Sequence, residues 1–172
     1  RELKMSDLTA IILCGGKGLR LRPLTNDTPK PLINIDNKPI LSHVIKHLRK
    51  HGINKFLIAT GYQSNKIKKF MKETYTNLDY KLVDSGDTGI LARVKDCIKN
   101  INSDFLLCYG DTISDINLTE LVKFHKKNIN SVIISSFPIM IPFGVMEVDK
   151  KNNVRSFDEK PILQNVMNIG YY

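Results

Sequence analysis

The sequence predicts an α/β fold with an open, mostly parallel sheet and helices on both faces. Short apolar runs alternate with stretches of helical period, which is typical of repeated strand–helix–strand units. A glycine-rich segment and the triplet YGD follow directly after two of these runs, at the strand ends where open α/β sheets bind ligands. A chain of 172 residues is long enough for one good core. We therefore expect a single Rossmann-like domain over residues 9–172, after a polar lead-in at residues 1–8.

The strands and helices follow from apolar periodicity. Five apolar runs are predicted strands: residues 9–14, 55–60, 80–84, 104–109 and 131–136. Four stretches are predicted helices: residues 40–51, a segment around residues 67–71, residues 88–99 and residues 117–127. The first helix places Leu41, Val44, Ile45 and Leu48 on one face, and Asn117 or Asp115 is available to cap the last. After residue 137, prolines and short runs indicate strands and turns rather than further crossovers.

Composition excludes several classes of protein. No apolar run approaches the roughly 18 residues of a membrane span, and no secretory signal precedes the first strand. We therefore expect a cytoplasmic protein that has no membrane partner. The three cysteines are odd in number, widely spaced and set in apolar runs, which favours reduced core thiols over disulfides or a metal site.

A formal net charge of +9 is compatible with nucleic acid, an acidic surface or a polyanionic small molecule as partner. Much of this charge lies in the stretches HVIKHLRKHG and NKIKKFMKETY, between the apolar positions of predicted helices. Such spacing favours a solvated outer face over a nucleic-acid-binding stripe. We therefore expect no nucleic-acid partner.

The segment LCGGKGLRLRPLTNDTPKPL, residues 13–32, has the chemistry of a phosphate-binding loop. Bare backbone amides suit phosphate oxygens, and three glycines supply them: Gly15, Gly16 and Gly18. Their spacing is neither GxxxxGK[ST] nor GxGxxG, and a tight turn beside a basic loop is the alternative. Arg20 adds a bidentate donor, and Lys30 adds a compact charge between two prolines. Together these residues predict an anionic, phosphorylated ligand.

This segment resembles the signature of the sugar-phosphate nucleotidyltransferases, GGxGxRLxPLT followed by PKP. Further matches follow in order over about residues 9–172: NKPIL, HGINKFLIATGY, YGDTISDINLTEL, FGVMEVD, FDEKP and NIGYY. The segments KPIL, HGIN and YGD followed by SDIN look most like the glucose-1-phosphate cytidylyltransferase branch of the family. The resemblance implies the nucleotide-diphospho-sugar transferase type of fold.

The resemblance also implies the reaction. A phosphate oxygen of the acceptor attacks the α-phosphorus of a nucleoside triphosphate, with CTP favoured, and pyrophosphate leaves in a Mg²⁺-dependent step. The acceptor would be a sugar-1-phosphate, phosphoglutamine or phosphocholine, and the product would serve capsule or other surface polysaccharide synthesis.

Roles for individual residues are carried over from the family motifs. The residues implied for the nucleotide are Leu13, Gly15, Gly16, Gly18, Arg20 and Gly89. Those implied for the acceptor are Lys30, Glu159, Lys160 and Asn168. Arg20 and Lys30 would be catalytic, and Asp111 would bind Mg²⁺. The plainer alternatives are a strand-end turn for Asp111, a helix start for Gly89, and a solvent salt bridge for Glu159 and Lys160. One departure is clear, since Ile90, Leu91 and Ala92 precede Arg93 where the cytidylyltransferase pattern reads TGGRLKR.

The sequence is also compatible with other functions. The chain could be a nucleotide-binding regulatory subunit without turnover, a nucleotidyltransferase for purine, uridine or thymidine nucleotides, or a nucleic-acid-binding module. The family also supplies a second metal-binding aspartate from a later strand, so either the domain continues beyond Tyr172 or that carboxylate is missing. The sequence leaves open whether the chain forms a homo-oligomer.

Overall fold

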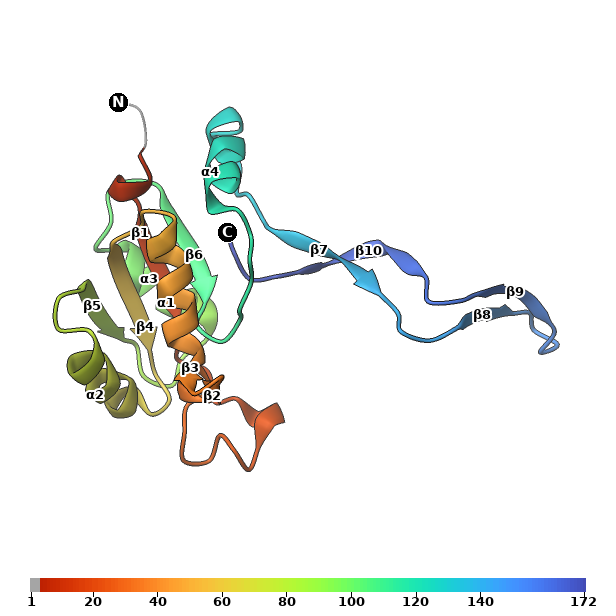
Figure 1. Cartoon of the computed structure of the whole chain (residues 1–172), viewed down its shortest axis with the longest axis horizontal. Helices are drawn as coiled ribbons and strands as arrows, with labels where there is room; N and C mark the ends of the chain where they lie inside the picture. The colour runs from red at the N-terminus through yellow and green to blue at the C-terminus, as the bar shows by residue number, and fades with distance from the viewer. Residues whose placement is uncertain (1–3) are drawn as a thin grey trace.

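The structure is a computed structural model that describes residues 4–172, and its centre is a four-stranded parallel sheet (Figure 1). Its strands are β1 (Thr9–Leu13), β4 (Lys55–Thr60), β5 (Asp79–Asp84) and β6 (Phe105–Tyr109). They run in the order β5-β4-β1-β6, and β1 pairs in parallel with both β4 and β6. The order reverses at β1, so the ends of β1 and β6 open onto one crevice.

The described residues form four α-helices, as predicted, and the first three connect strands of the sheet. They are α1 (Ile40–Lys50), α2 (Ser64–Thr74), α3 (Ile90–Ile98) and α4 (Leu118–Lys127). The cap of α4 is Asn117, whose side-chain oxygen accepts from the backbone N–H of Thr119 and Glu120 at 3.1 and 3.2 Å. The loop between β1 and α1 holds only short elements: η2 (Leu19–Leu21), η3 (Lys30–Leu32), β2 (Asn34–Ile35) and β3 (Lys38–Pro39). One further 3-10 turn, η1 (Met5–Asp7), precedes β1.

Alternate residues of β1 enter two different hydrophobic clusters, because successive strand side chains point to opposite faces. Ile12 belongs to the cluster that contains the apolar faces of α1 and α2. Ile11 belongs to the cluster that contains Cys97 of α3. The prediction of helices on both faces is therefore confirmed. Cys14, Cys97 and Cys108 are all buried free thiols, as expected for core residues.

The prediction of a fifth parallel strand at residues 131–136 was wrong. The free edge of β6 is taken instead by the last residues, which run antiparallel to it. Leu107 and Tyr172 exchange backbone hydrogen bonds of 3.0 and 2.9 Å, and Tyr171 is buried. The segment before β7 reaches only the outer side of this added strand, where the Ser135 N–H donates to the Tyr171 carbonyl at 2.9 Å.

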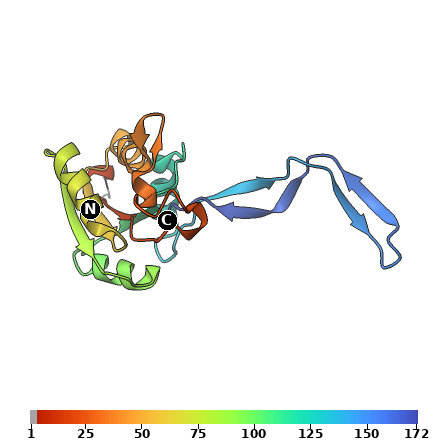
Figure 2. The same cartoon turned by 90° about the horizontal axis from the view of Figure 1, so that it is seen from below.

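Residues 136–168 form an arm that projects from the sheet body (Figures 1 and 2). Near the body, β7 (Ser136–Met140) pairs with β10 (Ile162–Asn168), and farther out β8 (Val145–Val148) pairs with β9 (Val154–Asp158). Both pairs are antiparallel, so the prediction of strands and turns in this region is confirmed. Within residues 4–172, no helix has the length and apolar character needed to cross a membrane.

Candidate active site

A cavity of about 690 Å³ opens at the carboxyl ends of β1 and β6. Most of the predicted site residues line it: Leu13, Gly15, Gly16, Gly18, Arg20, Lys30, Asp111 and Asn168. They come from segments far apart in the sequence, and the parallel sheet brings them together because its strands end at one edge. The cavity has the size of a small-molecule site.

The glycine loop after β1 is shaped by close contacts that exclude a side chain. Gly18 has φ +62°, in the left-handed region, and a Cβ there would lie 2.9 Å from Thr25 Cγ2. The buried Thr25 hydroxyl donates to the Gly18 carbonyl at 2.9 Å. By contrast, a Cβ on Gly16 would meet nothing within 4 Å. The left-handed backbone at position 18 and the nearby Thr25 side chain therefore require glycine there. Gly16 instead leaves its backbone open to the cavity.

Lys30 and Asp111 form an ion pair across the cavity, with Nζ and Oδ2 2.7 Å apart. Their side chains are 30% and 29% exposed, so both remain accessible from the cavity. Arg20 lies exposed on η2 and lines the same cavity. Arg20, Lys30 and Asp111 thus place two cations and one carboxylate in the cavity lining. These charges suit a polyphosphate bound together with a divalent cation.

The residues present fit Mg²⁺ bound together with a nucleotide. Among residues 4–172, no group of three or more acidic, histidine or cysteine side chains could hold a metal alone. Mg²⁺ does not need such a group, because it commonly takes one or two carboxylates and completes its shell with water and substrate phosphates. Asp111 supplies one carboxylate of this kind.

Arg93 also lines the cavity, and sequence reasoning missed it as a site residue. It is only 6% exposed, its Nη2 donates to the Gly86 carbonyl at 3.2 Å, and its Nε is buried without a partner in the described chain. A Cβ on Gly15 would lie 2.2 Å from Arg93 Nε, and one on Gly61 would lie 2.7 Å from Nη2. The signal in the sequence was its position four residues before Cys97, on the buried face of α3.

Three residues at the start of α2 anchor the loop that carries the cations. Tyr62 Oη donates to the carbonyls of Thr25 and Asn26 at 3.3 and 3.1 Å, and Gln63 Nε2 donates to that of Asn26 at 2.7 Å. Lys66 Nζ donates to the next carbonyl, that of Asp27. Because three successive carbonyls are held, the segment between Arg20 and Lys30 is fixed against the start of α2.

Three predicted residues do not line the cavity. Gly89 is the N-cap of α3, next to the lining residue Ile90. Glu159 and Lys160 follow β9 on the arm, with side chains 62% and 68% exposed and Oε1 and Nζ 3.9 Å apart. The roles of these residues stay predictions. Asn168, at the end of β10, does reach the cavity, and its Oδ1 accepts from the Gly170 N–H at 2.8 Å.

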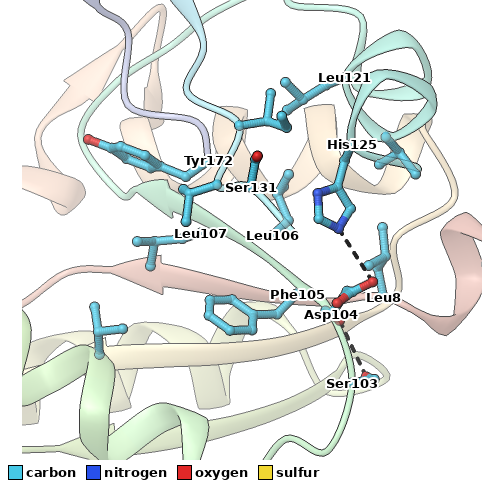
Figure 3. Close-up of a pocket in the computed structure, with 14 residues that line it drawn as sticks. Leu8, Ser103, Asp104, Phe105, Leu106, Leu107, Leu121, His125, Ser131 and Tyr172 are labelled. Carbon is cyan, nitrogen blue, oxygen red and sulfur yellow. Dashed lines mark hydrogen bonds and ion pairs between the residues drawn. The ribbon is translucent and has the colours of Figure 1, made fainter. Parts of the chain in front are cut away.

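A second cavity of about 360 Å³ lies beside α4 and β6 (Figure 3). Its lining is largely apolar, and its ionisable side chains are His125 and Asp104, with Nε2 and Oδ2 3.4 Å apart. No predicted site residue lines it. The residues predicted to bind phosphate are therefore gathered at the first cavity.

Comparison with known proteins identifies the family of this chain. The nucleotidyl transferase family profile matches residues 9–172. A probable glucose-1-phosphate cytidylyltransferase of Bacillus subtilis is 32% identical, with 96% of this chain and 74% of that protein covered. A mannose-1-phosphate guanylyltransferase catalytic subunit beta of Xenopus tropicalis is 33% identical, with 96% of this chain but 49% of that protein covered. The chain thus spans only about half the length of some curated relatives.

Solved structures share the fold. HddC from Yersinia pseudotuberculosis superposes with a TM-score of 0.72 at 24% identity, covering 95% of this chain and 75% of that one. A UDP-glucose pyrophosphorylase complexed with UDP-glucose superposes with a TM-score of 0.69 at 18% identity, covering 95% and 74%. At these identities the structures support the fold alone, and the family follows from the profile and the curated relatives. The chain belongs to the nucleotidyl transferase family, among the sugar-phosphate nucleotidyltransferases.

Proposed function

We propose that this protein transfers CMP from CTP to a phosphorylated small-molecule acceptor and releases pyrophosphate in a Mg²⁺-dependent reaction. The observation that carries the proposal is the Lys30–Asp111 pair at 2.7 Å, which shares one cavity with Arg20 and the glycine loop. The similarity to a probable glucose-1-phosphate cytidylyltransferase supports CTP as the nucleotide.

The chain's own residues would act by positioning and by neutralising charge. The acceptor phosphate is already an anion at neutral pH, so the reaction needs no general base. Backbone amides at Gly16 and Gly18, together with Arg20, would hold the triphosphate. Lys30 would lie between the α-phosphate and the incoming acceptor phosphate and would offset the charge that builds up between them.

Asp111 would hold the metal at this site. When bound, Mg²⁺ would neutralise phosphate charge and polarise the α-phosphoryl group. The Lys30 ammonium would then have to exchange its contact with Asp111 for one with phosphate. In the free protein, the Lys30–Asp111 ion pair keeps both groups in place before the substrates arrive.

The acceptor would approach from the side of Asn168 and the arm. Asn168 lines the cavity at the end of β10, and Glu159 and Lys160 lie farther along the same arm. A sugar-1-phosphate is the acceptor that most relatives' names suggest, and phosphoglutamine and phosphocholine are the non-sugar alternatives. We place the reaction in the cytoplasm and its product in capsule or other surface polysaccharide synthesis.

Pyrophosphate release tests the proposal. Purified protein with Mg²⁺ would be given CTP, UTP, dTTP, GTP or ATP, each crossed with sugar-1-phosphates, phosphocholine and phosphoglutamine. The expected result is release that requires CTP, Mg²⁺ and one class of acceptor. Nucleotide binding without release across the whole panel would contradict turnover and favour a regulatory nucleotide-binding subunit.

A further inference from the structure

Arg93 and the Lys30–Asp111 pair line the same cavity but contact the ends of different strands. The sheet order places the residues that follow each strand in a row, with Gly86 after β5, Gly61 after β4, Gly15 after β1 and Asp111 after β6. Arg93 lies against the first three of these and Lys30 against the last. Since neighbouring strands are about 4.8 Å apart, Gly61 and Asp111 follow strands about 10 Å apart, which leaves room between them for part of a nucleotide.

The Arg93 guanidinium has hydrogen-bonding capacity that the protein does not use. A guanidinium carries five N–H donors, and within residues 4–172 its one protein acceptor is the Gly86 carbonyl. No carboxylate of the described chain lies within ion-pair distance of it. A buried charge that lacks acceptors is unfavourable by itself, so a ligand that supplies acceptors at this position would offset the cost.

The same group is held rigidly. Two glycines leave room for it, because a Cβ on Gly15 or Gly61 would lie 2.2 or 2.7 Å from guanidinium nitrogens. The Gly86 carbonyl fixes Nη2 at 3.2 Å. The exposed Lys17–Asp87 ion pair, with Nζ and Oδ2 2.6 Å apart, joins the glycine loop to the loop before α3. A planar donor fixed in this way can distinguish ligands by the hydrogen-bond donors and acceptors along their edges.

We propose that Arg93 binds the nucleobase and selects bases that present two adjacent acceptors. This inference rests on the proposed function, because a triphosphate held at Arg20, Lys30 and Asp111 leaves the base at the Arg93 end. Cytosine presents O2 beside N3, and guanine presents O6 beside N7, so both match a donor-only guanidinium. Uracil and thymine place an N–H donor beside each carbonyl, and adenine places its amino group beside N7. Arg93 therefore favours CTP or GTP over UTP, dTTP and ATP.

Nucleotide binding can test this without knowledge of the acceptor. Dissociation constants would be measured calorimetrically for the Mg²⁺ complexes of CTP, GTP, UTP and ATP. The proteins would be wild type, Arg93→Met, which keeps bulk without donors, and Arg93→Lys, which keeps charge without the planar fork. Lys95→Met is the matched control, because it removes a charge from an exposed position of the same helix.

We expect wild type to bind CTP or GTP about 10- to 100-fold more tightly than UTP and ATP, as for one bidentate arginine–base contact. The Arg93→Met and Arg93→Lys variants should lose most of that preference, and Lys95→Met should keep it. Equal weakening of all four nucleotides in Arg93→Met would overturn the inference and assign Arg93 to the phosphates. An unchanged preference would overturn it as well.

The outcomes separate this inference from the proposed function. If binding shows the expected base preference but no acceptor gives pyrophosphate release, base selection stands and the transferase proposal fails. If pyrophosphate is released but Arg93→Lys keeps the wild-type preference, the transferase stands and base selection fails. Should Arg93→Met not fold, as judged by circular dichroism, Arg93→Lys decides the question. Absence of nucleotide binding by wild type would overturn both.

Discussion

The sheet body and the arm are built from strands of similar apolar character but in opposite environments. In β1, Ala10, Ile11 and Ile12 are fully buried between helices. In β10, which reads ILQNVMN, every residue is exposed. The nucleotide end of the site therefore rests on a packed core, whereas the predicted acceptor residues Glu159 and Lys160 stand on a two-stranded ribbon. The two ends of the proposed site therefore differ in how tightly the surrounding residues pack against them.

The sheet body and the arm should differ most in how far a truncated side chain destabilises the fold. Ile12→Ala should cost about 2–5 kcal/mol in free energy of unfolding, because it leaves a cavity in the core. Ile162→Ala on the arm, where the side chain is 67% exposed, should change it by less than about 0.5 kcal/mol. Urea titration of both variants would measure this. Similar losses in the two would mean that the arm is packed in solution.

The next effect concerns turnover. Arg20→Ala and Lys30→Ala should each lower the rate of pyrophosphate release by on the order of 10² to 10³, as when one transition-state donor is removed. Asp111→Asn should raise the Mg²⁺ concentration needed for half-maximal rate. Glu120→Gln, on exposed α4, is the control and should leave both quantities unchanged. A near wild-type rate in either cation variant would remove that residue from the mechanism.

Two neighbouring glycines at the nucleotide end should tolerate alanine differently. Gly15→Ala should cost about 1–3 kcal/mol, because its Cβ would overlap the Arg93 guanidinium at 2.2 Å. Gly16→Ala, one residue on, meets nothing within 4 Å and should leave the unfolding midpoint almost unchanged. The midpoints of thermal unfolding of the two variants would be compared with that of wild type. Equal stability would show that Arg93 is not packed under the glycine loop.

The smallest expected effect concerns the contacts by which Tyr62 holds the loop between Arg20 and Lys30. Tyr62→Phe removes the hydroxyl that donates to the Thr25 and Asn26 carbonyls, which should cost about 0.5–1.5 kcal/mol. Because the anchored segment carries Arg20 and Lys30, the KM for nucleotide should rise more than kcat falls. Tyr75→Phe, away from this loop, is the matched control. A fall in kcat alone would indicate a role for Tyr62 in the chemical step.

Local patterns in the sequence predicted the parts of the fold that local physics determines. Helix α1 was recognised because its apolar residues repeat with helical period, and the glycine loop was recognised because bare backbone and fixed cations have a chemical meaning. The pairing of β6 with the C-terminal residues was not predicted, because the segment at 131–136 has the same apolar composition as a central strand. Which segment occupies a sheet edge depends on long-range contacts that such patterns do not record.

The missed site residues have a similar explanation. An arginine on a helix is usually solvated, and the burial of Arg93 depends on glycines from three different loops. The anchor at Tyr62, Gln63 and Lys66 binds backbone carbonyls, which any residue type would supply. Neither set of contacts can therefore be predicted from the residue types alone.

Hydrogen exchange with and without Mg²⁺ and CTP would test the claim that nucleotide binds along the carboxyl ends of the parallel strands. We predict slower amide exchange in residues 13–20, 85–93 and 109–112, with no change in β8 or β9 beyond the site. Protection confined to the arm, or to the cavity beside α4, would contradict the claim.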